Sequence, residues 1–215
     1  MTDLGRLRSN VDGVRARIAA ACARAGRNPS SVTLVVVTKS IPKELIPQLS
    51  ELGVTDIGEN RAVEALERVG GLGGFRRHMI GHLQTNKVAK ALQWADAIHS
   101  VDRASLVREL SKTQRKVPVF VQINVSGEES KGGFAPEEAE AAVAGAREAL
   151  DVVGLMTMAP EGVDARPHFR RLRELSARIG VPNLSMGMTQ DFETAVEEGA
   201  THVRVGTAIF EGVLI

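Results

Sequence analysis

The chain has 215 residues, of which 43% are hydrophobic and 25% charged, a composition typical of a soluble globular domain with a sizeable core. Its 27 basic and 26 acidic side chains give a formal charge of +1, which leaves no strong basic field for nucleic-acid binding. The polar N-terminus and the lack of a long apolar run argue against a signal peptide or a membrane span, so we expect a cytoplasmic protein.

An amphipathic helix is predicted at the start of the chain. Apolar residues recur there at steps of three and four, at Leu4, Leu7, Val11, Val14, Ile18 and Cys22. Cys22 is the single cysteine and cannot form an internal disulfide, which fits a reducing cytoplasm. Its position in the apolar stripe predicts a small buried core residue.

From residue 32 onward, short apolar runs alternate with longer helical patterns. We predict eight strands, at Thr33–Thr38, Val54–Ile57, His78–Ile80, Ala97–Ser100, Val117–Val125, Val152–Met158, Asn183–Met186 and Val203–Gly206. Helical segments begin near Lys43, Asn60, Thr85, Asp102, Pro136, Arg166 and Gln190, and a short closing piece follows Thr207. Such alternation implies parallel pairing through right-handed crossovers. The sequence therefore predicts an α/β fold, a single (β/α)8 TIM barrel with an extra N-terminal helix over residues 1–215. An open doubly wound sheet is the alternative.

Lys39 is the first candidate site residue, because active sites of such barrels are built at the carboxyl ends of the strands. It directly follows the apolar run LVVV, and strand alternation can turn it into the barrel mouth. Partial desolvation there would lower the pKa of the ammonium group and give a nucleophilic amine. The alternative, which this segment alone favours, is a strand-end lysine that simply reaches solvent.

The loops after the seventh and eighth strands commonly bind phosphate in barrels of this kind. Ser185 and Thr207 offer hydroxyl groups in these loops, and Gly187 and Gly206 allow backbone N–H groups to approach an anion. Either loop alone could consist of ordinary turn residues. Because suitable residues occur in both loops, we predict a phosphate site.

Arg204 stands out within the eighth strand. Alternation turns His202, Arg204 and Gly206 toward the barrel interior. A guanidinium group there would either form a buried ion pair, with Glu59 as a candidate partner, or lie beneath the ring nitrogen of a ligand.

The histidines do not indicate a metal site, since His78 and His82 are four residues apart but flank a predicted strand and loop. His82 is a candidate ligand contact. Lys131, in a long charged loop, is a candidate second amine near the site.

Seven segments carry a family resemblance: VVVTKS around Lys39, DIGENR at Asp56–Arg61, HMIGHLQTNK at His78–Lys87, IHSVDR at Ile98–Arg103, VQINVSGEESKGGF at Val121–Phe134, GLMTMAP at Gly154–Pro160, and LSMGMTQDFETAVEEGATHVRVGTAIFEG at Leu184–Gly212. Over nearly the whole chain they resemble the pyridoxal phosphate homeostasis proteins, whose barrel is similar to the N-terminal domain of alanine racemase.

The resemblance implies that pyridoxal 5′-phosphate is held as a Schiff base on Lys39. It further implies contacts from Asn60 near the ring, and Arg204 directed toward the pyridine nitrogen. The implied phosphate site consists of Ser185, Gly206 and Thr207 with neighbouring backbone amides at Met186 and Gly187. Family members keep pools of the cofactor in balance and are not known for a fast reaction, so we assign no catalytic residue.

Two enzyme classes are alternatives. A racemase of the alanine racemase type uses a tyrosine as its second base, and this chain contains no tyrosine, although another group such as His82 could act instead. Arg204 facing the pyridine nitrogen would disfavour its protonation and weaken the ring as an electron sink, which suits a carrier better than a transaminase. A Schiff-base aldolase would use Lys39 and the phosphate loops for a sugar phosphate.

We expect a monomeric cofactor carrier, with apo forms of pyridoxal-phosphate-dependent enzymes as candidate partners.

Overall fold

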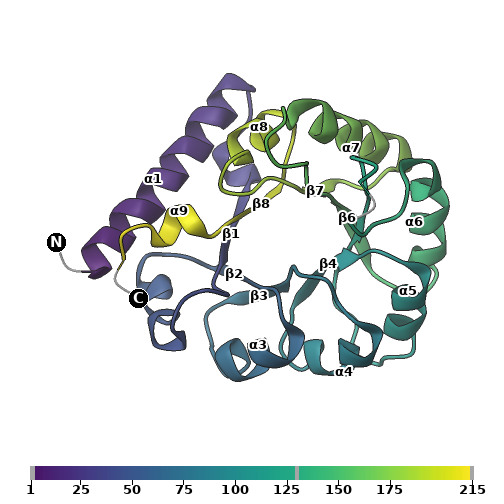
Figure 1. Ribbon diagram of the computed structural model, residues 1–215, viewed down its shortest axis with the longest axis horizontal. Helices are drawn as coiled ribbons and strands as arrows, with labels where there is room; N and C mark the ends of the chain where they lie inside the picture. The colour runs from purple at the N-terminus through teal and green to yellow at the C-terminus, as the bar shows by residue number, and fades with distance from the viewer. Residues whose placement is uncertain (1–2, 129–130, 214–215) are drawn as a thin grey trace.

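Eight parallel strands close into a barrel (Figure 1). They are β1 (Thr33–Val37), β2 (Asp56–Glu59), β3 (Arg76–Met79), β4 (Ala97–Val101), β5 (Val119–Gln122), β6 (Val152–Met156), β7 (Asn183–Ser185) and β8 (His202–Val205). Each strand pairs with the next along the chain, and β1 pairs with β8 to close the ring. The predicted barrel is confirmed, and the open-sheet alternative is wrong. This computed structural model describes residues 3–128 and 131–213, so both ends of the predicted 1–215 domain lie outside the described residues.

A ring of helices surrounds the barrel (Figure 1). The α-helices are α1 (Asp3–Arg24), α2 (Gln48–Glu51), α3 (Ala62–Val69), α4 (Val88–Ala91), α5 (Ala104–Ser111), α6 (Ala139–Arg147), α7 (Arg166–Ile179), α8 (Phe192–Glu197) and α9 (Thr207–Phe210). Short 3-10 turns are η1 (Pro29–Ser31), η2 (Lys43–Leu45), η3 (Thr85–Lys87) and η4 (Pro136–Glu138). Within the described ranges, no helix has the length and apolar character needed to cross a membrane.

The N-terminal helix α1 packs against α8 and α9, the last two helices of the chain (Figure 1). The predicted apolar stripe forms its buried side, from Leu7 through Val11 and Val14 to Ile18 and Cys22. Cys22 is fully buried, as predicted. The extra helix therefore covers the seam at which the first and last strands meet.

Several strand boundaries differ from the prediction because local hydrogen bonds compete with the sheet. The backbone of Val54 donates to Leu49 in the turn after α2, so β2 begins two residues later, at Asp56. Near the end of β5, Asn124 donates its N–H to Phe134 in the following loop, not to a neighbouring strand. The strand is consequently shorter than the apolar run that predicted it.

The two faces of the barrel wall differ in character. The large apolar core lies between the strands and the helices and includes Val36, Ile57 and Leu155. Alternate positions face the interior, where Phe120 and Met156 lie among buried polar residues. The interior-facing polar side chains include Asp56, His78, His99, Ser185, His202 and Arg204.

Candidate functional site

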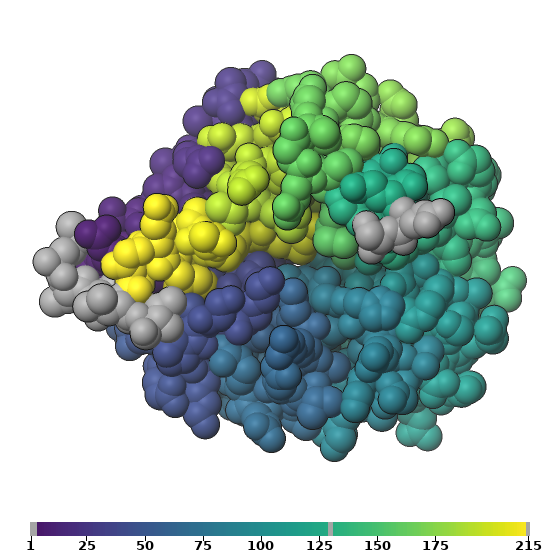
Figure 2. Space-filling model, in the orientation of Figure 1, coloured from purple at the N-terminus to yellow at the C-terminus, as the bar shows by residue number. Residues whose placement is uncertain are grey.

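Lys39 lies just beyond β1, at the carboxyl end of the barrel. Because β1 pairs with both β2 and β8, the loops that follow these three strands are neighbours at this end. Lys39 is exposed and helps to line a cavity of about 380 Å³ with Asn60, Glu59 and Arg68. In Figure 2 the yellow C-terminal segment meets the blue segments of the first part of the chain near the middle of this face. The exposed Lys39 side chain therefore lies at the carboxyl end of the barrel.

Arg68, from α3, fixes the backbone on both sides of Lys39. Its Nη2 donates to the carbonyl of Thr38 at 2.7 Å and to that of Ile41 at 2.6 Å. Its Nε reaches Glu59 at 3.3 Å, and the Thr38 hydroxyl donates to the same carboxylate at 2.7 Å. These contacts hold the segment that carries Lys39 in one conformation.

Asn60 follows β2 and supplies an unpaired polar atom beside Lys39. Its side-chain Oδ1 is buried and has no hydrogen-bond partner among the described residues. A buried acceptor without a donor costs about 1–3 kcal/mol, and an N–H or O–H group of a ligand would remove that cost. Gly81 packs directly on this residue, since a Cβ there would lie 2.3 Å from the Asn60 carbonyl oxygen. The Asn60 backbone is therefore packed against Gly81, while its side-chain Oδ1 has no hydrogen-bond partner among the described residues.

The loop after β7 is joined to strand β8. The backbone N–H of Arg204 donates to the Gly187 carbonyl at 2.9 Å. Gly187 has a φ of +93°, a conformation that favours glycine. Thr207 is exposed at the start of α9, and Gly206 beside it is half-buried. Both residues thus lie at the carboxyl end, together with Lys39.

Ser185 and Met186 lie deeper than the phosphate prediction assumes. Both are fully buried. The N–H of Met186 donates to the His202 carbonyl at 3.1 Å, as part of the pairing between β7 and β8. The Ser185 hydroxyl contacts His99 at 2.7 Å and Arg204 at 2.6 Å. Protein groups therefore already engage the polar groups of these two residues.

Arg204 is buried inside the barrel and only 4% exposed, as the strand alternation predicted. Its Nη1 donates to Ser185, and its Nη2 donates to the carbonyl of Thr157 at 3.0 Å. Burial lowers the pKa of Arg204 to about 10, an effect that Asp191 partly opposes, so the group stays charged at neutral pH. The suggested ion pair with Glu59 is wrong, because alternation from the inward-facing residues of β2 places Glu59 on the outer face, beside Arg68.

His82 lies at the carboxyl end of β3, on the rim of the site. Its side chain is 62% exposed, and its Nδ1 lies 2.8 Å from a carboxylate oxygen of Asp102. Asp102 in turn pairs with Arg103. Within residues 3–128 and 131–213, no group of three or more histidine, cysteine, aspartate or glutamate residues is placed to hold a metal ion.

Lys131 is engaged with neighbouring loops. Its Nζ lies 2.8 Å from Glu128 and donates to the Ala159 carbonyl, also at 2.8 Å. The side chain is 22% exposed. Lys131 therefore joins the loop after β5 to the loop after β6.

Three histidines inside the barrel were not assigned a role from the sequence. His78 and His99 are fully buried, and their nearest ring nitrogens lie 2.9 Å apart. His78 also bonds to Asp56 at 2.8 Å, and His202 packs against both rings. The strand alternation that turned Arg204 inward applies to β3 and β4 as well, and would have predicted these inward positions.

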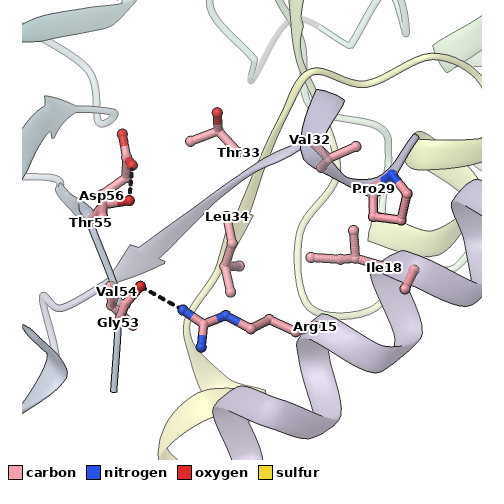
Figure 3. Close-up of a pocket in the computed structure, with 11 residues that line it drawn as sticks. Arg15, Ile18, Pro29, Val32, Thr33, Leu34, Gly53, Val54, Thr55 and Asp56 are labelled. Carbon is pink, nitrogen blue, oxygen red and sulfur yellow. Dashed lines mark hydrogen bonds between the residues drawn. The ribbon is translucent and has the colours of Figure 1, made fainter. Parts of the chain in front are cut away.

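A larger cavity lies at the other end of the barrel. It has a volume of about 500 Å³ and lies between α1 and the first residues of β1 and β2 (Figure 3). Arg15 spans part of it and donates to the carbonyls of Leu52 and Gly53 at 2.8 and 2.7 Å. Asp56 is at its edge and accepts a hydrogen bond from Thr55 (Figure 3). This cavity is remote from Lys39, so size does not identify the site.

Comparisons with known proteins identify the family. The model of the alanine racemase N-terminal domain matches residues 2–212. A pyridoxal phosphate homeostasis protein from Aquifex aeolicus is 41% identical over 211 residues, covering 90% of this chain and 92% of the relative. This chain belongs to the pyridoxal phosphate homeostasis protein family. The predicted family resemblance is thereby confirmed.

Solved structures support the same family and fold. PipY from Synechococcus elongatus PCC7942, described with pyridoxal phosphate bound, is 32% identical, with a TM-score of 0.75. The match covers 90% of this chain and 99% of PipY. An alanine racemase from Corynebacterium glutamicum has a TM-score of 0.73 but is 18% identical, and the match covers 96% of this chain and 60% of the racemase. That second likeness concerns the barrel fold alone.

Proposed function

We propose that this protein binds pyridoxal 5′-phosphate, holds it as a Schiff base on Lys39 and serves intracellular homeostasis of the cofactor. The observation that carries the proposal is the exposed Lys39 side chain at the carboxyl end of the barrel, which lines a cavity with Asn60 and its unpaired buried acceptor. The family supports it as well, since PipY is described with pyridoxal phosphate bound.

The residues at the mouth fit this cofactor. Lys39 supplies the amine, Asn60 an acceptor beside it, and the buried Arg204 a cation for the ring nitrogen. Gly206 and Thr207, together with the backbone near Gly187, are the proposed phosphate contacts at the carboxyl end. The cofactor supplies an aldehyde and, in enzymes, an electron-withdrawing ring. The protein side chains bind and orient it.

A carrier fits these residues better than a racemase. Proton transfer at an amino acid needs an acid or base beside the cofactor, and the chain has no tyrosine for that task. His82 is the nearest alternative, but it is largely exposed and bonded to Asp102. A charged Arg204 at the ring nitrogen would also oppose ring protonation and weaken the ring as an electron sink, which suits a carrier better than a transaminase.

Absorbance tests the proposal. The protein mixed with pyridoxal phosphate should gain an absorbance band in the near-visible range that borohydride abolishes. Lys39→Ala should fold and lose the band, because the side chain is exposed and not part of the core. Lys87→Ala is the matched control, since Lys87 lines a neighbouring pocket with Asn60 and His82. A band unchanged in Lys39→Ala, or no band in the unmodified protein, would contradict the proposal.

Chiral analysis separates a carrier from a racemase. The loaded protein is incubated with L-alanine or L-serine, and formation of the D-enantiomer is followed. The proposal expects turnover far below the rates of about 1 per second and faster that are typical of enzymes. Inversion at enzymatic rates would establish the racemase instead.

We propose further that the protein acts as a cytoplasmic monomer which passes the cofactor to apo-enzymes. The single buried cysteine is compatible with a reducing compartment. Sedimentation would measure the oligomeric state. Activation of an apo-enzyme by the loaded protein, compared with an equal concentration of free cofactor, would test the transfer.

A further inference from the structure

A continuous chain of hydrogen bonds crosses the barrel interior from β2 to β8. Asp56 Oδ1 lies 2.8 Å from His78 Nε2, and His78 Nδ1 lies 2.9 Å from His99 Nε2. His99 Nδ1 lies 2.7 Å from Ser185 Oγ, which accepts from Arg204 at 2.6 Å. His78, His99 and Ser185 are fully buried, so water does not compete for these bonds. We call these five residues the interior relay.

The chemistry of the two end groups fixes the bonds at the ends of the interior relay. A guanidinium group can only donate, so Ser185 Oγ is the acceptor from Arg204. At the other end, burial acts to raise the pKa of Asp56. Hydrogen bonds from His78 and Thr55 outweigh this effect, and the pKa is below the usual value of 3.8. Asp56 is therefore a carboxylate that can only accept, and His78 Nε2 carries a proton.

The two bonds in the middle then follow. Burial lowers the pKa of His99 well below 6.5, so its imidazole is neutral. The His78 proton that the Asp56 carboxylate requires is on Nε2, which leaves His78 Nδ1 as the acceptor from His99 Nε2. His99 Nδ1 is then an acceptor, and the Ser185 hydroxyl donates to it. Each contact holds one proton, and the charge of Asp56 balances that of Arg204.

We propose that the interior relay is a one-directional hydrogen-bond chain that positions the Arg204 guanidinium for the cofactor ring, with the Ser185 hydroxyl donating to His99 and not to the phosphate. Asp56, His78, His99 and Ser185 are thus positioning residues. The part that concerns the ring rests on the proposed function, whereas the direction of the hydrogen bonds does not.

Arg204 keeps free donors for this task. Of its five N–H groups, one is directed to Ser185 and one to the carbonyl of Thr157. The two bonds come from different terminal nitrogens, so they fix the plane of the guanidinium group as well as its position. Loss of either acceptor would let the group turn.

The first experiment measures the protonation of the histidines in the cofactor-free protein by ¹⁵N NMR at neutral pH. The proposal expects His78 and His99 both to be neutral and to carry the proton on Nε2. An Nδ1–H form of His99, or an imidazolium at His78, would reverse the bonds and overturn the proposal. Because the unmodified protein is used, no variant has to fold.

The second experiment compares two ligands, pyridoxal 5′-phosphate and 5′-deoxypyridoxal, which has the same ring without the phosphate. Ser185→Ala should weaken both by the same factor, about fivefold for one hydrogen bond. Thr207→Val should weaken only the phosphate-bearing ligand. Ser185→Ala acting on the phosphate-bearing ligand alone, or on neither, would overturn the positioning role.

His202 provides the matched control. Its ring packs in the same buried cluster, but its Nδ1 bonds to Thr201, outside the interior relay. His202→Gln should leave the ratio of the two ligand affinities and the His99 tautomer unchanged. A changed His99 tautomer in this variant would count against the relay. If neither ligand binds the unmodified protein, the proposed function fails, and the NMR result still decides the direction of the bonds.

Discussion

Acidification from pH 7 to pH 5 should destabilise this protein through its buried histidines. Burial, with smaller effects from neighbouring positive charges, lowers the pKa of His202 from 6.5 to about 4. Between these two values the unfolded chain takes up a proton that the folded protein does not. The free energy of unfolding is therefore highest above pH 6.5 and falls as the pH decreases toward 4.

The size of the effect follows from the two pKa values. The difference between 6.5 and about 4 corresponds to about 3 kcal/mol for His202, which is largely buried. About 2 kcal/mol of this falls between pH 7 and pH 5. The lowered pKa of His99 adds to the loss in the same direction. Asp56, whose pKa lies below 3.8, titrates below this range and does not obscure the effect.

Urea unfolding at pH 7 and pH 5 measures this difference. We expect the unmodified protein to lose at least about 2 kcal/mol, and His202→Gln to lose about 2 kcal/mol less than the unmodified protein. The comparison uses the change with pH, so a uniform loss of packing in the variant cancels. An equal pH effect in both proteins would refute the assignment of His202 as a buried neutral group.

Two further substitutions test how the mouth is held. Arg68→Ala removes both donors to the Thr38 and Ile41 carbonyls and should lower the free energy of unfolding by about 1–3 kcal/mol and weaken the cofactor. Arg61→Ala should do neither, because the Arg61 guanidinium bonds a surface glutamate and, among the residues that the structure describes, no backbone carbonyl. Gly187→Ala should cost about 1–3 kcal/mol, because φ is +93° and a Cβ would come 2.5 Å from a side chain of α8. Urea unfolding measures the stability of these variants, and absorbance titration measures their affinity for the cofactor. Wild-type values in Arg68→Ala or Gly187→Ala would contradict the account.

The barrel could be predicted because its signal is local. Apolar runs and helical patterns depend on neighbours in the sequence, and all eight predicted strands overlap the observed ones. Boundaries were less accurate because single hydrogen bonds decide them, as at Val54. The positions of Lys39, Gly206 and Thr207 at the carboxyl end followed from the same strand order.

The interior could not be predicted in the same way, because its contacts join distant residues. His99 and Ser185 are 86 residues apart in the chain and meet only when the barrel closes. Alternation alone indicates that both face inward, but not that they bond. Likewise, the sequence showed Glu59 and Arg204 as opposite charges at strand ends, and only the observed bounds of β2, with Asp56 facing inward, place them on different faces of the wall.

The most direct test of the central claim is to locate the cofactor on the chain. The loaded protein is reduced with borohydride and digested, and the peptides are analysed by mass spectrometry. The account predicts a pyridoxyl-phosphate adduct on Lys39 in the unmodified protein and none at this site in Lys39→Ala. An adduct mainly on another lysine, such as Lys131, or no adduct at all, would contradict it.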